Sequence, residues 1–172
     1  MQTGYYSVSD IDTSEDPDSP YFYEDTVVVL ENSFTKAGYD FTGFNTKADG
    51  SGEDYQPGDE ITIVDDIVLY AQYNINIYVV EFKNWDNTLI ANKSVEHGGT
   101  VVQPSDPERE GYLFSWWDKS LENITENTTI TATYELDINY IEDLVKKAEE
   151  TKDPDDIEKA REWVMLLDDG QV

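Results

Sequence analysis

The chain has 172 residues, and its 38 acidic and 11 basic residues give a formal charge of −27 at pH 7. This charge repels nucleic-acid phosphate and anionic lipid, so we expect neither nucleic acid nor a membrane surface among the partners. The length suits two small domains or one of ordinary size, and 13% aromatic residues can fill small cores although only 38% of residues are hydrophobic.

An acidic stretch lies near the start of the chain. Five carboxylates are spaced among oxygen-bearing side chains there: Asp10, Asp12, Glu15, Asp16 and Asp18. Such a pattern can hold Ca²⁺, but the ordered spacing, central glycine and closing glutamate of an EF-hand loop are missing. We therefore favour a solvated acidic loop and leave open a weak calcium site at Asp10, Asp12, Asp16 and Asp18. We expect no other cofactor.

Two parts of the chain repeat one pattern. Residues 37–44 (AGYDFTGF) recur as residues 110–117 (EGYLFSWW), 73 positions later. The alternating stretch 67–73 (IVLYAQY) recurs as 128–134 (TTITATY), only 61 positions later. The second copy therefore lacks 12 residues, which belong to the loop 45–58 of the first copy. Matching strands around a loop of different length are typical of repeats of one scaffold.

Alternation of apolar and polar residues predicts β-strands in both copies. Tyr78, Val80 and Phe82 lie on one face of a predicted strand, with the period of two expected of a half-buried strand. Residues 67–73 and 128–134 alternate in the same way, and glycine-rich turns separate the strands. Each copy therefore reads as a handful of short strands.

The two copies resemble the Listeria–Bacteroides repeat, the family that includes the B repeat of listerial internalins. The resemblance of the first copy rests on residues 27–35, 38–46, 48–52 and 68–73, and that of the second on residues 80–88, 97–99, Pro104, Pro107 and 110–114. It implies a β-grasp-like fold for each copy. Trp116 stands where the family usually has glycine, Phe44 stands where it usually has tryptophan, and the opening strand of the first copy matches poorly.

After Tyr134 the period changes from that of strands to that of helices. Asp137 is a plausible N-cap for a first helix, and Asp153-Pro154 is a strong start signal for a second, with Gly170 suited to its C-terminal cap. We predict a hairpin of two helices joined at residues 151–153. Residues 145–162 also resemble small helical spacer repeats of Gram-positive surface and phage proteins, which usually carry a third helix.

Each predicted helix has one apolar face. The two faces contain Ile141, Leu144, Val145 and Ala148 on the first helix and Ile157, Ala160, Val164 and Leu167 on the second. Two short helices cannot cover these faces between themselves, so we expect docking on the second repeat or on a partner. The binding residues that we predict here are Ile141, Leu144, Ile157, Val164 and Trp163.

The aromatic residues of the repeats are expected to lie mostly in the cores. They include Tyr39, Phe44, Trp85, Tyr112 and Trp117, and most of them recur at equivalent repeat positions. Trp116 is the exception, because it neighbours Trp117 on a strand and one of the pair must point outward. An exposed indole can stack on a sugar or on another protein, so we predict Trp116 as a binding residue.

No arrangement of residues indicates catalysis. The sequence has one histidine (His97), no cysteine, and neither a Gly-x-Ser-x-Gly elbow nor a phosphate-binding glycine loop. No pair of carboxylates is placed by the sequence in a cleft, as glycoside hydrolysis would require. We predict that the chain is not an enzyme.

Taken together, these patterns predict an α+β, mainly β chain with three parts. Two tandem β-grasp-like repeats (1–74 and 75–135) precede a helical hairpin (136–172) that contacts a protein partner and allows oligomers. Because Met1 begins the sequence and no signal peptide, membrane span or wall anchor is visible, we favour a virion-surface protein of a Gram-positive phage, such as a capsid decoration or fibre. An adhesin stalk or host-binding module of a bacterial wall protein, outside the cell, is the first alternative. A module that binds cell-wall glycan for a wall-active enzyme is the second.

Overall fold

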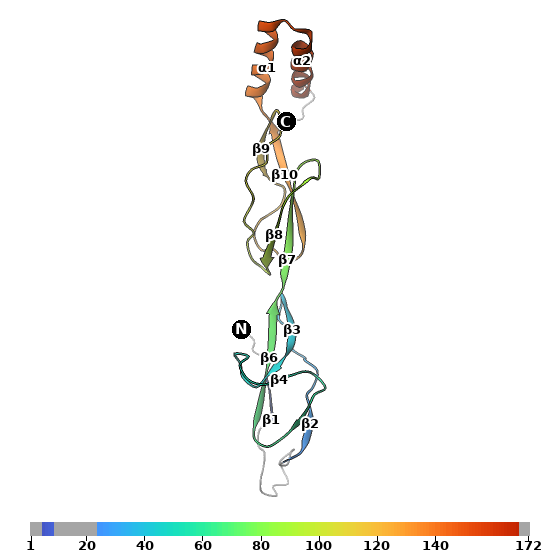
Figure 1. Ribbon diagram of the computed structural model, residues 1–172, viewed down its shortest axis with the longest axis vertical. Helices are drawn as coiled ribbons and strands as arrows, with labels where there is room; N and C mark the ends of the chain where they lie inside the picture. Colours follow the sequence, from blue (N-terminus) through green and yellow to red (C-terminus); the bar gives the residue numbers. More distant parts are fainter. Residues whose placement is uncertain (1–4, 9–23, 169–172) are drawn as a thin grey trace. The chain divides into compact units, whose positions relative to one another are not determined.

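The computed structural model describes residues 5–8 and 24–168, and the chain divides into two compact units between Asn76 and Ile77 (Figure 1). Strands make up most of the regular structure and two helices follow them, which confirms the predicted α+β class with mainly β content. No helix in the described parts of the chain is long and apolar enough to cross a bilayer. The predicted calcium ligands Asp10, Asp12, Asp16 and Asp18 lie outside the described residues, as does the predicted cap Gly170.

The first unit combines a four-stranded antiparallel sheet with a two-stranded ladder. The sheet has the order β1-β6-β3-β4, and the ladder pairs β2 with β5. These strands are β1 (Tyr5–Val8), β2 (Thr26–Val28), β3 (Tyr39–Asn45), β4 (Asp54–Tyr55), β5 (Glu60–Thr62) and β6 (Ile67–Ile75). The core joins the two parts, because its buried members come from both: Val29, Phe44, Ile61, Ile63 and Leu69.

Asn45 organises the loop that only the first repeat has. Its side chain is fully buried, and its Nδ2 donates to Asp54 Oδ1 at 2.7 Å and to the Gly50 carbonyl at 3.2 Å. Its Oδ1 accepts hydrogen bonds from the backbone N–H groups of Lys47 and Gly52 at 2.8 and 2.9 Å. A buried amide with partners for both ends fixes the loop, because leaving either end unpaired would cost about 1–3 kcal/mol.

The second unit contains one four-stranded sheet with the order β8-β7-β10-β9. Its strands are β7 (Ile77–Lys83), β8 (Leu89–Glu96), β9 (Tyr112–Trp117) and β10 (Thr128–Leu136). The predicted inward faces are confirmed, since Val80, Phe82 and Ile130 are fully buried. Phe82 packs edge-to-face on Trp117, with ring centroids 4.8 Å apart.

The sheets of the two repeats correspond on one side and differ on the other. β3 pairs with β6 as β9 pairs with β10, antiparallel in both cases. The strand on the other side of β6 is β1, which runs antiparallel to it, whereas β7 runs parallel to β10. The difference falls on the opening strand of the first copy, whose sequence matches the family poorly. The β-grasp-like arrangement of the repeats stays a prediction.

The predicted hairpin forms, with α1 (Ile138–Thr151) and α2 (Pro154–Asp168) side by side (Figure 1). Asp137 caps α1, since its carboxylate accepts from the backbone N–H groups of Asn139 and Tyr140 at 3.0 and 3.3 Å. Asp153 accepts from Asp155 N–H at 2.9 Å at the start of α2. Between the helices Lys152 adopts a left-handed conformation (φ 53°), which ends α1.

Candidate interaction surfaces

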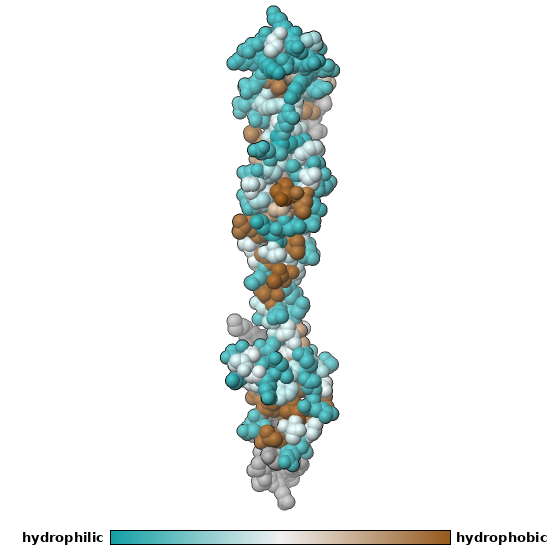
Figure 2. All heavy atoms as spheres, viewed as in Figure 1, coloured by the Kyte–Doolittle hydropathy of each residue, from teal (hydrophilic) through white to brown (hydrophobic). Residues whose placement is uncertain are grey.

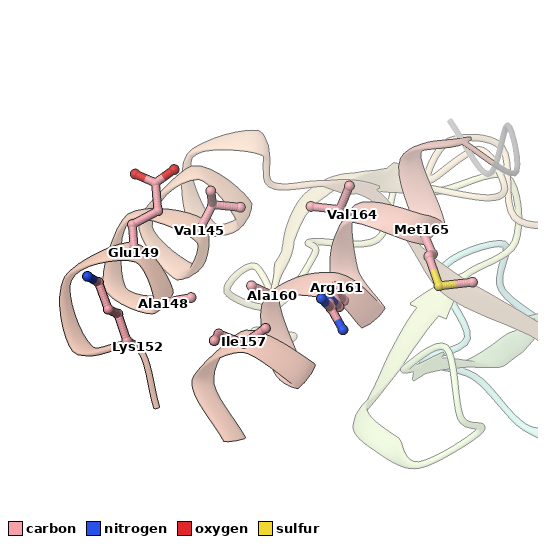
Figure 3. A pocket seen from close by; sticks show the side chains of 9 residues that line it. All are labelled: Val145, Ala148, Glu149, Lys152, Ile157, Ala160, Arg161, Val164 and Met165. Carbon is pink, nitrogen blue, oxygen red and sulfur yellow. The ribbon is translucent and has the colours of Figure 1, made fainter. Parts of the chain in front are cut away.

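The helical hairpin carries an open apolar groove of 640 Å³ between α1 and α2. Figure 3 shows its lining, with Ala148 and Ala160 pointing toward one another from the two helices. Its apolar residues are Val145, Ala148, Ile157, Ala160, Val164 and Met165. The two alanines are buried, whereas Met165 is 65% exposed. Small residues therefore hold the helices close together, and the larger apolar side chains remain at the surface.

The apolar surface continues along the hairpin beyond this groove. A second hollow of 400 Å³ shares Val145, Glu149 and Val164 with the first and extends to Ile138 and Leu167. Ile138 is 48% exposed although it is fully apolar. Contiguous apolar surface on a helix pair normally marks an interface. The two hollows together, with lining residues between Ile138 and Leu167, are called the hairpin groove below.

Charged side chains border the hairpin groove. Lys146, Lys152 and Arg161 line it, and none of these three forms an ion pair within the described part of the chain. The other two basic residues of the hairpin are paired, Lys147 with Asp156 at 2.6 Å and Lys159 with Glu110 at 2.9 Å. The unpaired basic groups of the hairpin are therefore those at the groove.

The predicted hairpin residues divide between this groove and other places. Ile141, Ile157 and Val164 line the groove, while Leu144 is half-buried outside it. Sequence reasoning missed Met165 and the bordering Arg161. Both residues lie on the helical stripe of Ile157, with Arg161 at i+4 and Met165 at i+8. The charge of Arg161 interrupts the apolar pattern of this stripe, so the sequence did not reveal that the stripe continues to Met165.

Trp163 was predicted as a partner-binding residue, but the structure places its ring on the second repeat. A Cβ on Gly111 would overlap this ring, so glycine is required there for the close approach. Trp163 also packs edge-to-face on Tyr112 and Tyr140, at centroid distances of 5.6 and 5.2 Å. The Trp163 ring therefore packs on a residue of the same chain. The apolar pattern of α2 shows that this ring needs a contact, but it does not show whether the second repeat or a partner protein provides it.

A charged network holds the same joint. Glu110 accepts from the Tyr140 hydroxyl at 2.5 Å and from Lys159 Nζ at 2.9 Å. The hydrogen bond from Tyr140, followed by that from Lys159, lowers the pKa of Glu110 below its ordinary value. The Asp137 N–H, at the start of the hairpin, donates to the Gly111 carbonyl at 2.9 Å. The hairpin is thus docked on the second repeat, which is one of the two outcomes expected from the sequence.

Trp116 is exposed, as predicted from its place beside Trp117. It is 59% exposed on β9, whereas Trp117 is 8% exposed and belongs to the core. The Thr133 hydroxyl donates to the Trp116 carbonyl at 2.8 Å across to β10, which fixes the backbone beneath the indole. Figure 2 shows hydrophobic patches over the strands of a surface that is otherwise mostly hydrophilic.

Trp85 was expected in the core, and this prediction is wrong. It is 52% exposed in the tight turn after β7, where the Asn84 N–H donates to the Thr88 carbonyl at 2.8 Å. A residue at the tip of such a turn cannot reach the core. The guanidinium of Arg109 lies 4.2 Å from the Trp85 ring centroid and 3.6 Å from that of Tyr112, so the indole forms a cation–π contact at the surface instead.

No group of three or more metal-ligating side chains occurs among the residues that the structure describes. Asp54, which the sequence places near other carboxylates, is the partner of Asn45 Nδ2. The half-buried His97 has the Tyr78 hydroxyl 3.4 Å from its Nδ1. The features of the described chain that suit binding are therefore apolar and aromatic surfaces: the hairpin groove and Trp116.

Two small all-β repeats in series, the second joined to a helical hairpin, define a modular repeat protein. The Listeria–Bacteroides repeat domain matches residues 6–72 and 78–140. The chain belongs to this family, as the resemblance predicted.

Proteins with similar sequences occur in two bacteria. The chain is 33% identical over 145 residues to a predicted Gly-rich membrane protein of Evansella cellulosilytica, a match that covers 77% of this chain and 17% of that protein. It is 37% identical over 84 residues to internalin H of Listeria monocytogenes, covering 48% of this chain and 15% of internalin H. The chain thus spans less than a fifth of the length of either relative.

Proposed function

We propose that this chain is a non-enzymatic spacer and interaction module on the outer surface of a Gram-positive bacterium. The observation that carries the proposal is the tandem pair of family repeats. It is supported by the similarity of the chain to internalin H over 84 residues and to a far longer protein described as a membrane protein over 145 residues. Repeats of one small scaffold extend or space what they carry. This favours the bacterial wall over the virion as the site of action.

Within this module the repeats are the displayed part and the hairpin is the assembly element. Residues 1–135 carry 26 acidic and 6 basic residues, a charge of −20 that keeps the repeats solvated and repels similar surfaces. The hairpin holds the largest apolar groove described above, with Met165 65% exposed and Ile138 48% exposed. A partner protein that covers this groove would remove that apolar area from water.

Immunolabelling of the cells that produce the chain tests the location. Antibodies against the repeats should label intact cells as strongly as permeabilised cells. A cytoplasmic protein, detected with its own antibody, serves as the control for intact membranes. Labelling that appears only after permeabilisation would contradict a surface location.

The virion surface is the alternative that the sequence first favoured, and the same antibodies test it. Immunogold labelling of purified phage particles would support a capsid or fibre role. Labelling of the bacterial wall in cells that carry no phage would argue against it.

Glycan binding through Trp116 is a second candidate function, favoured by its 59% exposure on a strand. Tryptophan rings stack on the apolar faces of sugars, and a rigid backbone beneath the ring lowers the entropic cost. Calorimetric titration with purified cell-wall polysaccharide should show binding that Trp116→Ala abolishes. Trp85→Ala is the matched control, because Trp85 is similarly exposed (52%) but its ring already forms a cation–π contact with Arg109.

A further inference from the structure

β9 is the edge strand of its sheet and, within the described residues, pairs only with β10. The Thr133 hydroxyl of β10 donates to the Trp116 carbonyl at 2.8 Å. The Asp118 N–H donates to the Thr131 carbonyl, also on β10, at 2.9 Å. The C=O and N–H of a trans peptide unit point in opposite directions. The N–H and the C=O of Trp117 therefore both point away from β10, toward the open edge.

In the first repeat a strand occupies the equivalent edge. β4 lies antiparallel along β3 with Tyr55 opposite Phe44, and Phe44 is the equivalent of Trp117. The half-buried Tyr55 packs on the core, and the side chain of the next residue, Gln56, lies over Gly43. β4 belongs to the loop that is 12 residues shorter in the second repeat. The edge of β9 is therefore a place where this scaffold accepts an antiparallel strand and where this chain supplies none among its described residues.

A strand seated on β9 in the same way would place one side chain beside the exposed indole of Trp116. Trp116 is the equivalent of Gly43, over which Gln56 lies in the first repeat. Because the indole is 59% exposed, its ring is accessible to a side chain of the added strand. A guanidinium or an ammonium group next to such a ring gains a cation–π contact. The second repeat already contains one, since the Arg109 guanidinium lies 4.2 Å from the Trp85 ring centroid.

The charge of the second repeat favours a basic occupant. Residues 77–135 contain 10 acidic and 4 basic residues, a charge of −6. Two charged residues follow β9, and both are bound to β10: Asp118 Oδ1 accepts from the Thr131 N–H at 2.6 Å, and Lys119 Nζ donates to the Thr129 carbonyl at 2.7 Å. The exposed Glu135 of β10 forms no ion pair within the described chain. An acidic strand would be repelled here, and a basic one attracted.

We propose that the outer edge of β9 binds an extended segment of a partner protein as a fifth strand of the second sheet, antiparallel to β9 and with a basic residue beside Trp116. This goes beyond the assembly role of the hairpin groove, because it gives the second repeat a binding surface of its own. The N–H and C=O of Trp117 exchange hydrogen bonds with one residue of the segment, as in other cases of strand addition. The next residue of the segment carries the basic side chain, which stacks on the Trp116 ring.

A heptapeptide of sequence Gly-Lys-Lys-Tyr-Arg-Pro-Gly tests this proposal. It copies residues 52–58, except that lysine replaces the two acids and arginine replaces Gln56. Titration of the full chain at about 0.05 M salt, followed by amide NMR shifts, should show saturable binding along β9. Trp116→Ala should weaken this binding about tenfold, because the cation–π contact is lost. Trp85→Ala is the matched control and should leave it unchanged, since Trp85 is similarly exposed (52%) but lies in the turn after β7.

The decisive control changes only the backbone of the peptide. Methylation of its tyrosine nitrogen removes the N–H that would donate to the Trp117 carbonyl and leaves every side chain and the charge unchanged. Binding should weaken about tenfold or more, because a backbone hydrogen bond is lost and the methyl group enters its place. Hydrogen exchange of the Trp117 N–H should slow when the unmethylated peptide binds. The Phe44 amide, whose edge is already covered by β4, should show no change.

Three results would overturn the proposal. Equal binding of the methylated and unmethylated peptides would show that charge alone holds the peptide. Unchanged exchange of the Trp117 N–H at saturating peptide would show that no strand is added to β9. Binding of cell-wall polysaccharide through Trp116, without any binding of the peptide, would give the indole to a glycan instead. These measurements use the purified chain, so a chain found only inside cells would overturn the proposed location and not this proposal.

Discussion

The two repeats share a strand pair and differ in what lies along its outer edge. In β3 the residue Thr42 is an unpaired bulge opposite β6, and Ser115 is the same bulge in β9 opposite β10. The glycines that precede these strands have nearly equal left-handed conformations, with φ of 74° at Gly38 and 73° at Gly111. A bulge kept at the same place in both copies is a property of the scaffold.

In the first repeat, β4 and the residue after it cover the edge of β3. Gln56 Nε2 donates to the Thr42 carbonyl at 3.0 Å, which satisfies the bulge. A Cβ on Gly43 would overlap the Gln56 side chain and lie 3.1 Å from the Tyr55 carbonyl oxygen. With φ of 141°, Gly43 also has a backbone conformation that other residues rarely adopt. The covering segment therefore requires glycine at this position.

In the second repeat the covering segment is missing and the glycine is replaced. Twelve fewer residues separate the matched strands, and within the described chain β9 is an edge strand of its sheet. Trp116 stands at the position equivalent to Gly43, and its side chain is 59% exposed. One scaffold position thus serves either for a close backbone approach or for display of an aromatic ring.

The ends of the two repeats also differ in what they support. The Asn76 N–H donates to the Gly38 carbonyl, and the Asp137 N–H donates to the Gly111 carbonyl, both at 2.9 Å. The same backbone contact is followed by a further repeat in one case and by the hairpin in the other. Only Gly111 also receives the Trp163 ring. The backbone hydrogen bond at the end of each repeat is therefore the same whichever element follows. The side-chain contacts, such as that of Trp163, differ between the two cases.

The largest expected effect tests whether each repeat unfolds on its own core. Phe44 in the first repeat and Trp117 in the second occupy equivalent positions, and Phe44→Ala should lower the free energy of unfolding of its unit by about 3–5 kcal/mol. All four tryptophans follow residue 76, so their fluorescence in urea reports the second unit, whereas circular dichroism reports both. Phe44→Ala should shift the dichroism transition and leave the fluorescence transition unchanged. A fluorescence shift as large as the dichroism shift would show that the units unfold together.

The next effect tests the difference at the outer edge. Gly43→Ala should destabilise the first unit by about 1–3 kcal/mol from backbone strain, with a further loss from displacement of Gln56. Gly43→Ala combined with Gln56→Ala should recover the steric part only. Trp116→Gly is the reciprocal control and should cost about 1 kcal/mol or less, because Gly in a strand weakens it only slightly. Equal losses at the two positions, measured by urea denaturation, would refute the different roles assigned to them.

A third effect tests the hairpin joint. Gly111→Ala forces a side chain into a left-handed conformation, at a cost of about 1–2 kcal/mol, and its Cβ displaces the Trp163 ring. Hydrogen exchange of the α1 and α2 amides should accelerate, since the hairpin loses part of its docking surface. Trp163→Ala should accelerate the same amides without affecting the core strands β7 and β10. Unchanged helix protection in both variants would show that the joint contributes nothing to hairpin stability.

The smallest effect is a pH dependence at the joint between the second repeat and the hairpin. The pKa of Glu110 is lowered in the folded chain by Tyr140 and Lys159, so its contribution to stability is present above the ordinary pKa of a glutamate. That contribution is lost as the pH falls through the lowered folded value. Glu110→Gln should remove this part of the acid sensitivity of hairpin stability. The measurement is the helical circular dichroism of the wild type and the variant between about pH 5 and 2. The first repeat has Ala37 at the equivalent position, so Ala37→Ser is a neutral control.

The sequence by itself determined the features that depend on near neighbours. The inward faces of β7 and β10, the caps Asp137 and Asp153, and the outward indole of Trp116 all follow from spacings of one to four residues. The tandem pattern follows from the recurrence of residues 37–44 and 67–73 at 110–117 and 128–134. Alternation and capping are local, because a side chain's face or a free N–H group is set by the element that contains it.

Only the tertiary structure decided which apolar surfaces are covered. From its sequence alone Trp85 cannot be told from a core tryptophan. The turn places it at the surface, where the Arg109 guanidinium lies 4.2 Å from its ring centroid. Trp163 and Met165 lie two residues apart on one helix, yet one packs on Gly111 and the other is 65% exposed in the groove. The pairing of β1 antiparallel to β6, against β7 parallel to β10, is likewise a choice between distant strands. Such choices depend on contacts between residues far apart in sequence, and local periodicity carries no information about them.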